Sequence, residues 1–162
     1  MLEIHEDIPD VNHLARIYLA FVDCGRIDEV FYASHDLKYF IELMGTRKNW
    51  ICTINNTPVG FGVVNEYSPS WIRAEASFAF LPTCPARTAV TFGKMMLEAL
   101  FKSEIRLQYV YGTTPSRNKT AVKFAKMIGM REVARTPNFL DYKGSPDDAV
   151  ITYIERETAL GY

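Results

Sequence analysis

The chain has no excess of charge of either sign, no paired metal-ligand motif and no long apolar run. Its 162 residues include 18 Lys and Arg against 19 Asp and Glu, which gives a formal net charge of −1. Proteins that bind nucleic acid in general need a strong positive excess to neutralise phosphates, so the composition excludes that class. No segment approaches the roughly 20 apolar residues of a membrane helix, so we expect no membrane contact.

Cysteine and histidine are scarce as well. Cys24, Cys52 and Cys84 lie far apart, and with three scattered histidines they form no zinc-type spacing, so no metal site is predicted. We interpret all three as buried thiols in a reduced compartment. The first ten residues are acidic and lack the apolar core of a secretion signal. Together these features predict a cytoplasmic protein.

The residues that are present match a folded domain. Hydrophobic residues make up 48% of the chain and charged residues 23%, close to the averages of globular proteins. The length fits one domain, and no linker or repeat divides it, so residues 1–162 are predicted to form a single unit. Short strand patterns alternate with longer helical patterns, which predicts an α/β (α+β) fold with a mixed sheet.

Apolar periodicity places the individual elements. Helices are predicted at 14–21, 37–44, 88–101 and 117–128, with Ser34-His35-Asp36 as the N-cap segment of the second and Gly45 and Gly129 as stops. Strands are predicted at 2–5, 50–54, 59–64, 72–81, 107–111, 130–135 and 149–155. The strand at 72–81 is nearly all apolar or small, which is typical of the sheet centre. The Pro-, Gly- and Asp-rich segment before the last strand is expected to be a loop.

Two further features of the strands lead to predictions. Gly60 and Gly62 weaken the strand that contains them, so they indicate a close approach of other atoms to its backbone. The last strand, 150–155, is expected to lie exposed at a sheet edge. An exposed edge is a surface on which two copies can pair, so a homodimer is compatible with the sequence.

The segment from Asn118 to Met130 is the most informative part of the chain. Its sequence, NKTAVKFAKMIGM, is an amphipathic pattern that begins with an asparagine and ends with a glycine before a strand. It resembles the closing motif of the GNAT superfamily, the acetyl-CoA-dependent N-acetyltransferases, which reads N-x-x-A-x-x-x-Y-x-K-x-G-F. Asn118, Ala121 and Gly129 match this motif. Ala125 stands where the family has a tyrosine.

Other segments support the resemblance in the right order along the chain. The hairpin 51–64 resembles the second and third GNAT strands, 74–82 resembles the central fourth strand, and 93–100 resembles the helix after the pyrophosphate loop. The resemblance covers most of the chain. It implies a GNAT-like fold, a mixed and centrally splayed sheet of about six to seven strands flanked by about four helices.

The pyrophosphate loop departs from the family pattern Q/R-x-x-G-x-G/A. In register with the helix the chain reads TAVTFG over 88–93, so only the last glycine is kept. One interpretation is that the free backbone amides at a helix N-terminus still hold the phosphates of acetyl-CoA. These amides would be those of Val90, Thr91, Phe92, Gly93 and Lys94, with the side chains of Arg87, Thr88, Thr91 and Lys94 as further donors. The other is that Thr88 is a helix cap and that Arg87 and Lys94 are ordinary surface charges.

The remaining candidate residues follow from the resemblance. It implies that the backbone of Phe78 and Phe80 grips the pantetheine arm and that Asn118 lies at the cofactor. Amine acetylation needs a base for the ammonium, and Glu75 is placed to serve, unless it is paired with a nearby arginine, Arg73 or Arg106. It also needs a proton donor for the thiolate. Ala125 cannot donate, so the candidates at the end of the next strand are Tyr111 and Ser116.

Three functions are compatible with these residues. The first is an acetyl-CoA-dependent N-acyltransferase acting on an unidentified small-molecule or protein amine. The second is a GNAT-fold binding or assembly protein that has lost catalysis, since the tyrosine and the loop glycines are missing; small divergent chains of this kind resemble those of phage and prophage genomes. The third is an unrelated α/β ligand-binding domain, because each motif alone is weak.

Overall fold

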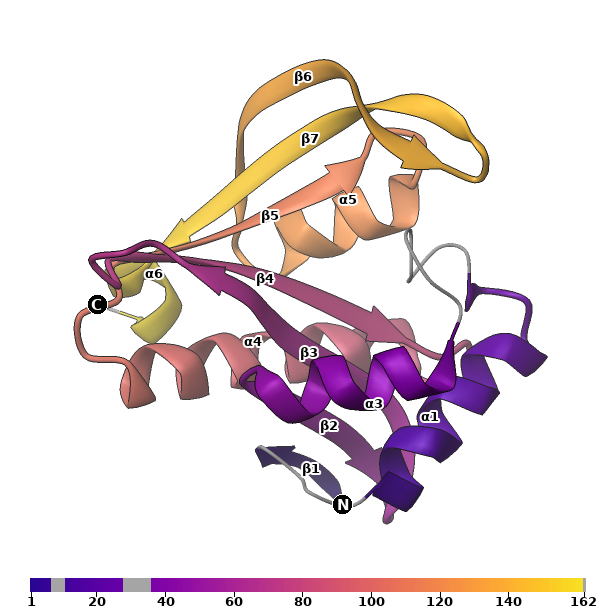
Figure 1. The fold of residues 1–162 in the computed structure, drawn as a ribbon. Coiled ribbons are helices and arrows are strands. Elements are labelled where there is room, and N and C mark those ends of the chain that lie inside the picture. Colours follow the sequence, from indigo (N-terminus) through magenta and orange to yellow (C-terminus); the bar gives the residue numbers. More distant parts are fainter. Residues whose placement is uncertain (7–10, 28–35, 162) are drawn as a thin grey trace.

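The computed structural model describes residues 1–6, 11–27 and 36–161. One mixed sheet of seven strands runs through the molecule in the order β1-β2-β3-β4-β5-β7-β6 (Figure 1). Only β4 and β5 are parallel neighbours, and β4 is central, as predicted. The strands are β1 (Leu2–Glu6), β2 (Asn49–Ile54), β3 (Thr57–Tyr67), β4 (Arg73–Phe80), β5 (Tyr109–Pro115), β6 (Arg131–Tyr142) and β7 (Ser145–Glu155).

Helices cover both faces of the sheet. The front face in Figure 1 carries α1 (Val11–Asp23) and α3 (Leu37–Thr46), and the opposite, rear face carries α4 (Ala86–Ser103) and α5 (Lys119–Met127). A short helix not predicted from the sequence, α6 (Arg156–Leu160), follows the last strand. Each pair of helices encloses its own buried apolar cluster against the sheet. Within the described residues no helix is long and apolar enough to span a membrane.

The helical periodicity predicted the buried faces correctly. In α1 the buried residues are the four apolar positions of the predicted pattern, Leu14, Ile17, Tyr18 and Phe21. The Asp36 carboxylate accepts the amide of Lys38 at 2.8 Å, which confirms the predicted cap of α3. His35, beside this cap, lies outside the described residues. Gly45 is not a stop, because α3 continues through it to Thr46.

The C-terminal hairpin corrects two expectations. The segment expected to be a loop is strand: β6 and β7 run on to a tight turn at Lys143 and Gly144, both with positive φ. β6 tolerates Pro137 because the register shifts between Thr136 and Leu140, where a missing amide costs no ladder bond. The strand 150–155 is not an edge either, because β7 is paired with β5 and β6 and the edge is β6.

The glycines of β3 confirm the predicted close approach. Gly60 and Gly62 lie opposite Phe80 and Phe78 of β4. A Cβ on Gly62 would lie 2.6 Å from the sulfur of Met96 and 3.1 Å from the Phe78 ring. The two glycines therefore make room for aromatic rings on the rear face. Of the cysteines, Cys52 and Cys84 are buried as expected, but Cys24 is exposed and that part of the prediction was wrong.

The splay of the sheet is the feature that creates a site. β4 and β5 pair only at their beginnings, over Arg73–Glu75 and Tyr109–Tyr111, and then diverge (Figure 1). On the rear side the ring of Phe124 from α5 lies 5.9 Å from the Phe78 ring and 5.4 Å from the Phe80 ring, between centroids. These ring contacts pack α5, which follows β5, against β4 on the rear face.

Asp147 fixes the far end of β5 to the C-terminal hairpin. Its buried carboxylate accepts the hydroxyl of Ser116 at 2.7 Å and the amides of Arg117 and Asp148 at 2.9 and 2.8 Å. Burial opposes ionisation of Asp147, but these hydrogen bonds and the charge of Arg117 hold its pKa below the usual value. The carboxylate therefore stabilises the folded protein once it is ionised.

We expect Asp147→Ala to lower the melting temperature at pH 7 by several degrees, because it leaves buried donors without an acceptor. Since the pKa is lowered in the folded state, this stabilisation is present above the ordinary pKa near 3.8 and is lost as the pH falls through the folded value. Thermal denaturation between pH 7 and pH 3 measures both effects. The exposed Asp141→Ala is the control. Equal melting temperatures of Asp147→Ala and wild type at pH 7 would contradict the assignment.

Candidate active site

A row of polar side chains crosses the sheet where the splay begins. The strand registers pair Glu66 with Glu75, Glu75 with Tyr111, and Tyr111 with Tyr153. Directly paired residues point to the same face of a sheet. This is the front face, because the neighbours Ala74 and Val110 belong to the rear core. A β-bulge between Val64 and Glu66 brings Glu66 into the row.

Glu75 is the half-buried carboxylate at the last paired position of β4. Burial raises its pKa, and the neighbouring Glu66 raises it further. A hydrogen bond with Thr113 and the positive charge of Arg47 lower the pKa in part. The alternative that Glu75 is paired with Arg73 or Arg106 is not seen, since no such ion pair forms among the described residues.

Tyr111 joins the row from β5. Its hydroxyl donates to Oε1 of Glu66 at 2.8 Å. Burial raises the pKa of Tyr111 to about 12, and the hydrogen bond to Glu66 and the charges of Glu75 and Glu66 act in the same direction. The hydroxyl therefore keeps its proton at neutral pH. It can orient the Glu66 carboxylate, but it is a weaker acid than an ordinary tyrosine and a poorer match to a thiolate.

Ser116 is not brought to this row. It follows the end of β5, five residues beyond Tyr111, which is roughly 16 Å along an extended strand. Its hydroxyl is bound to Asp147, and its amide donates to the carbonyl of Asp148. The structure thus gives Ser116 a role in joining β5 to the hairpin, and only two of the three candidate catalytic residues lie together.

The splay leaves one edge of β4 without a strand partner. Leu81 donates its amide to Val59 of β3 at 2.8 Å, so Leu81 faces β3. Backbone groups of successive strand residues point alternately to the two sides. The N–H and C=O groups of Phe78 and Phe80 therefore face the opening toward β5. The carbonyl of Phe80 accepts the guanidinium of Arg26 at 3.0 Å, whereas the groups of Phe78 lie beyond the point at which pairing with β5 has ended.

The start of α4 corrects the prediction for the cofactor loop. The helix begins at Ala86 with Pro85 as its N-cap, and the amide of Ala89 already donates to the Pro85 carbonyl. Only the first N–H groups of a helix lack partners within it, and here they belong to Ala86, Arg87 and Thr88. The expectation that the amides of 90–94 are free is wrong, because these residues lie inside the helix. Thr88 is not the cap.

The other residues of that segment have structural partners. Phe92 is fully buried, and Thr91 donates its hydroxyl to the carbonyl of Arg87 at 3.1 Å. A Cβ on Gly93 would lie 2.7 Å from Ile128 and 2.8 Å from Phe124. The one glycine that matches the family loop is therefore needed for the packing of α4 against α5.

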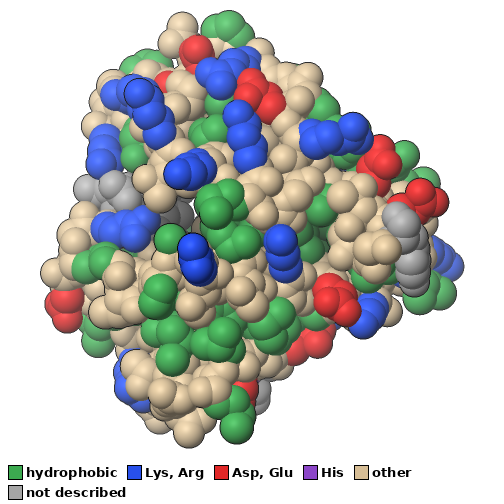
Figure 2. All heavy atoms as spheres, turned by 180° about the vertical axis from the view of Figure 1, so that it is seen from behind, with side chains coloured by type: hydrophobic (Ala, Val, Ile, Leu, Met, Phe, Trp, Pro, Cys, Tyr) green, Lys and Arg blue, Asp and Glu red, His purple; other side chains and the backbone are tan. Residues whose placement is uncertain are grey.

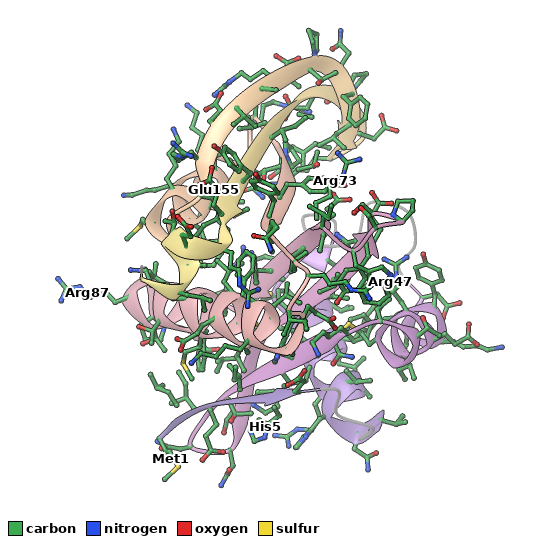
Figure 3. All side chains as sticks on the ribbon, turned by 90° about the vertical axis from the view of Figure 1, so that its left-hand side faces the viewer. Met1, His5, Arg47, Arg73, Arg87 and Glu155 are labelled. Carbon is green, nitrogen blue, oxygen red and sulfur yellow. The ribbon has the colours of Figure 1, made fainter. Side chains whose placement is uncertain are left out.

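The rear face carries positive side chains. Lys and Arg side chains are spread over this face in Figure 2, and Arg87 projects outward from it in Figure 3. Lys94 is exposed on the same helix, whereas Val90 is half-buried against the core. This charge favours a polyanion on the side of the sheet opposite to the Glu75 row.

The α5 motif has a clear structural role. The Asn118 side chain caps the helix by accepting the amide of Ala121 at 3.2 Å, and Gly129 ends it with a φ of +101°. Ala125, where the family has a tyrosine, is buried. At this position the chain supplies no proton donor, and the side-chain oxygen of Asn118 is already used by the helix.

A cavity of about 840 Å³ opens beside Glu66 of the polar row, where β3 ends. Glu66 is part of both the cavity and the polar row, because it lines the cavity and its carboxylate accepts the hydroxyl of Tyr111. Figure 3 shows Arg47, after the end of α3, and Arg73, at the start of β4, on the side where this cavity lies. Its walls come from the α3–β2 connection, the end of β3, the β3–β4 turn and the residue after α4, with the lining residues Met44, Gly45, Thr46, Arg47, Lys48, Asn49, Val64, Asn65, Glu66, Tyr67, Trp71 and Glu104.

Comparison with solved structures identifies the architecture. A variant of the spermidine N-acetyltransferase SpeG from Vibrio cholerae superposes with a TM-score of 0.80 at 16% identity, covering 98% of this chain and 96% of that one. An acetyltransferase of Salmonella typhimurium that modifies the N-terminal serine of ribosomal protein L7/L12 gives 0.79 at 12% identity, covering 95% and 94%. The chain has the GNAT fold. A GNAT-family acetyltransferase of Bacillus anthracis gives 0.74 at 20% identity, covering 96% and 95%.

At these identities the likeness to GNAT structures shows the fold alone. No protein-family model and no curated protein sequence matches the chain. Sequence reasoning missed three of the site residues, Glu66, Arg47 and Arg26. Glu66 joins the row only because of a β-bulge, and Arg47 and Arg26 act on β4 from segments that are distant in sequence. No spacing in the sequence could therefore predict these three residues.

Proposed function

We propose that the protein is an acetyl-CoA-dependent N-acyltransferase whose acceptor amine enters from the cavity beside Glu66. The observation that carries this proposal is the row of Glu66, Glu75 and Tyr111 at the point where β4 and β5 separate. On a GNAT fold this is where a front-side acceptor and a donor held at the β4 edge can meet. The structurally similar enzymes act on spermidine and on a protein N-terminal serine, so a small-molecule or a protein amine is compatible.

In this proposal Glu75, Tyr111 and Glu66 have separate roles at the acceptor amine. The raised pKa of Glu75 suits a base, because a carboxylate with a higher pKa takes a proton from an ammonium more readily. Tyr111 holds the Glu66 carboxylate beside it, and together the two carboxylates favour a cation at the front of the opening. Neither the buried Ala125 nor the distant Ser116 supplies an acid, which leaves water as the proton source for the departing thiol.

The residues present fit acetyl-CoA in part. The unpaired backbone of Phe78 on the β4 edge offers hydrogen bonds to an amide-containing arm, and the free amides of 86–88 at the start of α4 offer them to phosphate. When bound there, acetyl-CoA would supply the thioester acyl group for transfer. The glycine loop of the family is absent from this site and a full turn of helix stands in its place.

Binding of the cofactor is directly testable. At a hundredfold excess over Kd, acetyl-CoA stabilises the native state by about 2.7 kcal/mol, so we expect a rise in melting temperature of roughly 5–10 °C. Arg87→Glu, in the first turn of α4, should weaken binding about tenfold in calorimetric titration, since it adds a negative charge beside the phosphates. Lys102→Glu, in the last turn of the same helix, is the matched control and should bind like wild type. No binding at millimolar acetyl-CoA would contradict the proposal.

The second candidate is a GNAT-fold protein that binds the cofactor without catalysis. It is favoured by one observation, the alanine at position 125 in place of a proton donor. A thiol-release assay with acetyl-CoA and a panel of amines separates the two. Binding together with thiol release above the rate of the amine-free control supports the transferase, whereas binding without release across the panel supports the non-catalytic protein.

A further inference from the structure

Arg47 is a positive charge that the described residues leave without an acidic partner. It follows α3 in an extended conformation, half-buried, and lines the cavity beside Glu66. Its backbone carbonyl accepts the side chain of Asn49 at 2.9 Å, but its guanidinium forms no ion pair within the described part of the chain. Its neighbour Lys48 differs, because Lys48 is ion-paired with Glu6 and lies 5.7 Å from the centroid of the Trp50 ring.

Carboxylates line the same cavity. Glu66, held by Tyr111, and Glu104, which follows α4, are both lining residues, and Glu75 stands next to Glu66 in the row without lining the cavity. The charge of Arg47 acts on Glu75, yet the two groups form no ion pair, so space separates them. A cavity that is lined by an unpaired guanidinium and by carboxylates is complementary to a molecule that carries both charges.

An aromatic wall completes the cavity. Trp71 stacks on Tyr67 with ring centroids 4.2 Å apart and an angle of 19° between the ring planes. Trp71 has a φ of +60°, a conformation that is unfavourable for a bulky residue, and it is held there by the turn in which its amide donates to Ser68. The turn thus keeps a flat apolar surface beside Glu66, which is suited to the carbon skeleton of a ligand.

We propose that the acceptor is a small amino acid-like zwitterion, which places its carboxylate on Arg47 and its ammonium at Glu66 and Glu75. This inference rests on the proposed acyltransferase function and names its substrate class. The planar guanidinium matches a carboxylate through two parallel hydrogen bonds. The cavity volume of about 840 Å³ is in the range of small-molecule sites. A linear polyamine is disfavoured, because its second ammonium would lie against Arg47.

The reaction for such an acceptor is an ordinary acyl transfer. The amine nitrogen forms a bond to the thioester carbonyl carbon as the carbon–sulfur bond breaks. Glu75 takes the proton that the ammonium loses before the attack. The second proton, which the nitrogen loses once its bond to carbon has formed, passes to water, and water protonates the thiolate. The acceptor carboxylate takes no part in bond making and stays on Arg47, so Arg47 is a binding residue for the acceptor.

The test compares amino acids with the amines made by removing their carboxyl group. Thiol release from acetyl-CoA is measured for lysine against cadaverine, phenylalanine against phenethylamine, and tryptophan against tryptamine, with spermidine as the polyamine. We expect at least one amino acid to have a kcat/KM ten or more times that of its decarboxylated partner and of spermidine. Arg47→Gln should remove this preference by lowering kcat/KM for the amino acid about tenfold. Lys38→Gln, an exposed charge on α3 ion-paired with Glu42, should retain it.

A binding measurement separates failure of this inference from failure of the proposed function. Calorimetric titration of the same amino acids into the protein without acetyl-CoA should show binding that Arg47→Gln weakens about tenfold. If acetyl-CoA binds and amines are acetylated but the decarboxylated partners or spermidine are preferred, the zwitterion is ruled out and the acyltransferase stands. If acetyl-CoA does not bind but the amino acids bind through Arg47, the acyltransferase is ruled out and the acceptor site stands. No binding of any amino acid overturns the inference.

Discussion

Replacing Glu75 by glutamine is expected to lower kcat/KM for amine acetylation by roughly 10²–10⁴-fold, the usual effect of removing a general base. Glutamine keeps the size of the side chain and its contact with Thr113, but it cannot take a proton. In wild type kcat/KM should rise with pH as Glu75 ionises, with a pKa above its ordinary 4.5. In Glu75→Gln that part of the profile should disappear. Steady-state thiol release across pH 5–9 measures both.

The same substitution should make the protein more stable at neutral pH. Because burial and Glu66 raise the pKa of Glu75 in the folded state, folding favours its protonated form. Its contribution to stability is present below the unfolded pKa and is lost as the pH rises through the folded pKa. At pH 7 the carboxylate therefore opposes folding, and a neutral amide should raise the melting temperature by a degree or more, as is common when an active-site charge is removed.

The control for Glu75 is Glu98→Gln, which removes an exposed carboxylate that pairs with Lys102 on the rear helix α4. It should change neither the rate nor its pH profile. The assignment of Glu75 as the base fails if Glu75→Gln retains kcat/KM within about threefold of wild type. A lost rate together with a lowered melting temperature would instead mean that the variant has disturbed the fold and that the ionised Glu75 does not oppose folding.

Gly60→Ala is expected to lower the free energy of unfolding by about 2–3 kcal/mol, at the upper end of overpacking effects. A Cβ at this position would lie 2.7 Å from the carbonyl oxygen of Ala79 and would also overlap the Phe80 ring. The oxygen belongs to the backbone of the central strand, so it cannot move aside as a flexible side chain would. The melting temperature should fall by roughly 4–12 °C.

The matched control for Gly60 is Gly45→Ala. Gly45 lies in the helix α3, nothing stands within 4 Å of the position that an added methyl group would take, and its φ is not positive. Alanine is favoured over glycine in a helix by up to about 1 kcal/mol, so this variant should be slightly more stable than wild type. Denaturant titrations of both variants test the pair. A Gly60→Ala protein as stable as wild type would show that β3 and β4 do not approach each other so closely.

Much of the fold follows from local patterns. The four apolar positions of α1, the cap at Asp36 and the stop at Gly129 are predicted correctly, because a helix repeats every 3.6 residues and its ends need particular residues. The start of α4 is not predicted correctly. Pro85 offers no capping side chain, and the family pattern placed a loop where the chain forms the first turns of a helix.

The net charge of −1 excludes general nucleic-acid binding, but it does not show that the charges are unevenly distributed over the surface. The sequence by itself determined the class of fold, the central strand and the position of Glu75 and Tyr111 on neighbouring strands. Only the tertiary structure decided what stands beside them. A bulge turned Glu66 into their row, and the packing of α3 left Arg47 unpaired at a cavity. Register shifts and distances between segments remote in sequence depend on the packing of the whole chain, which no local spacing records.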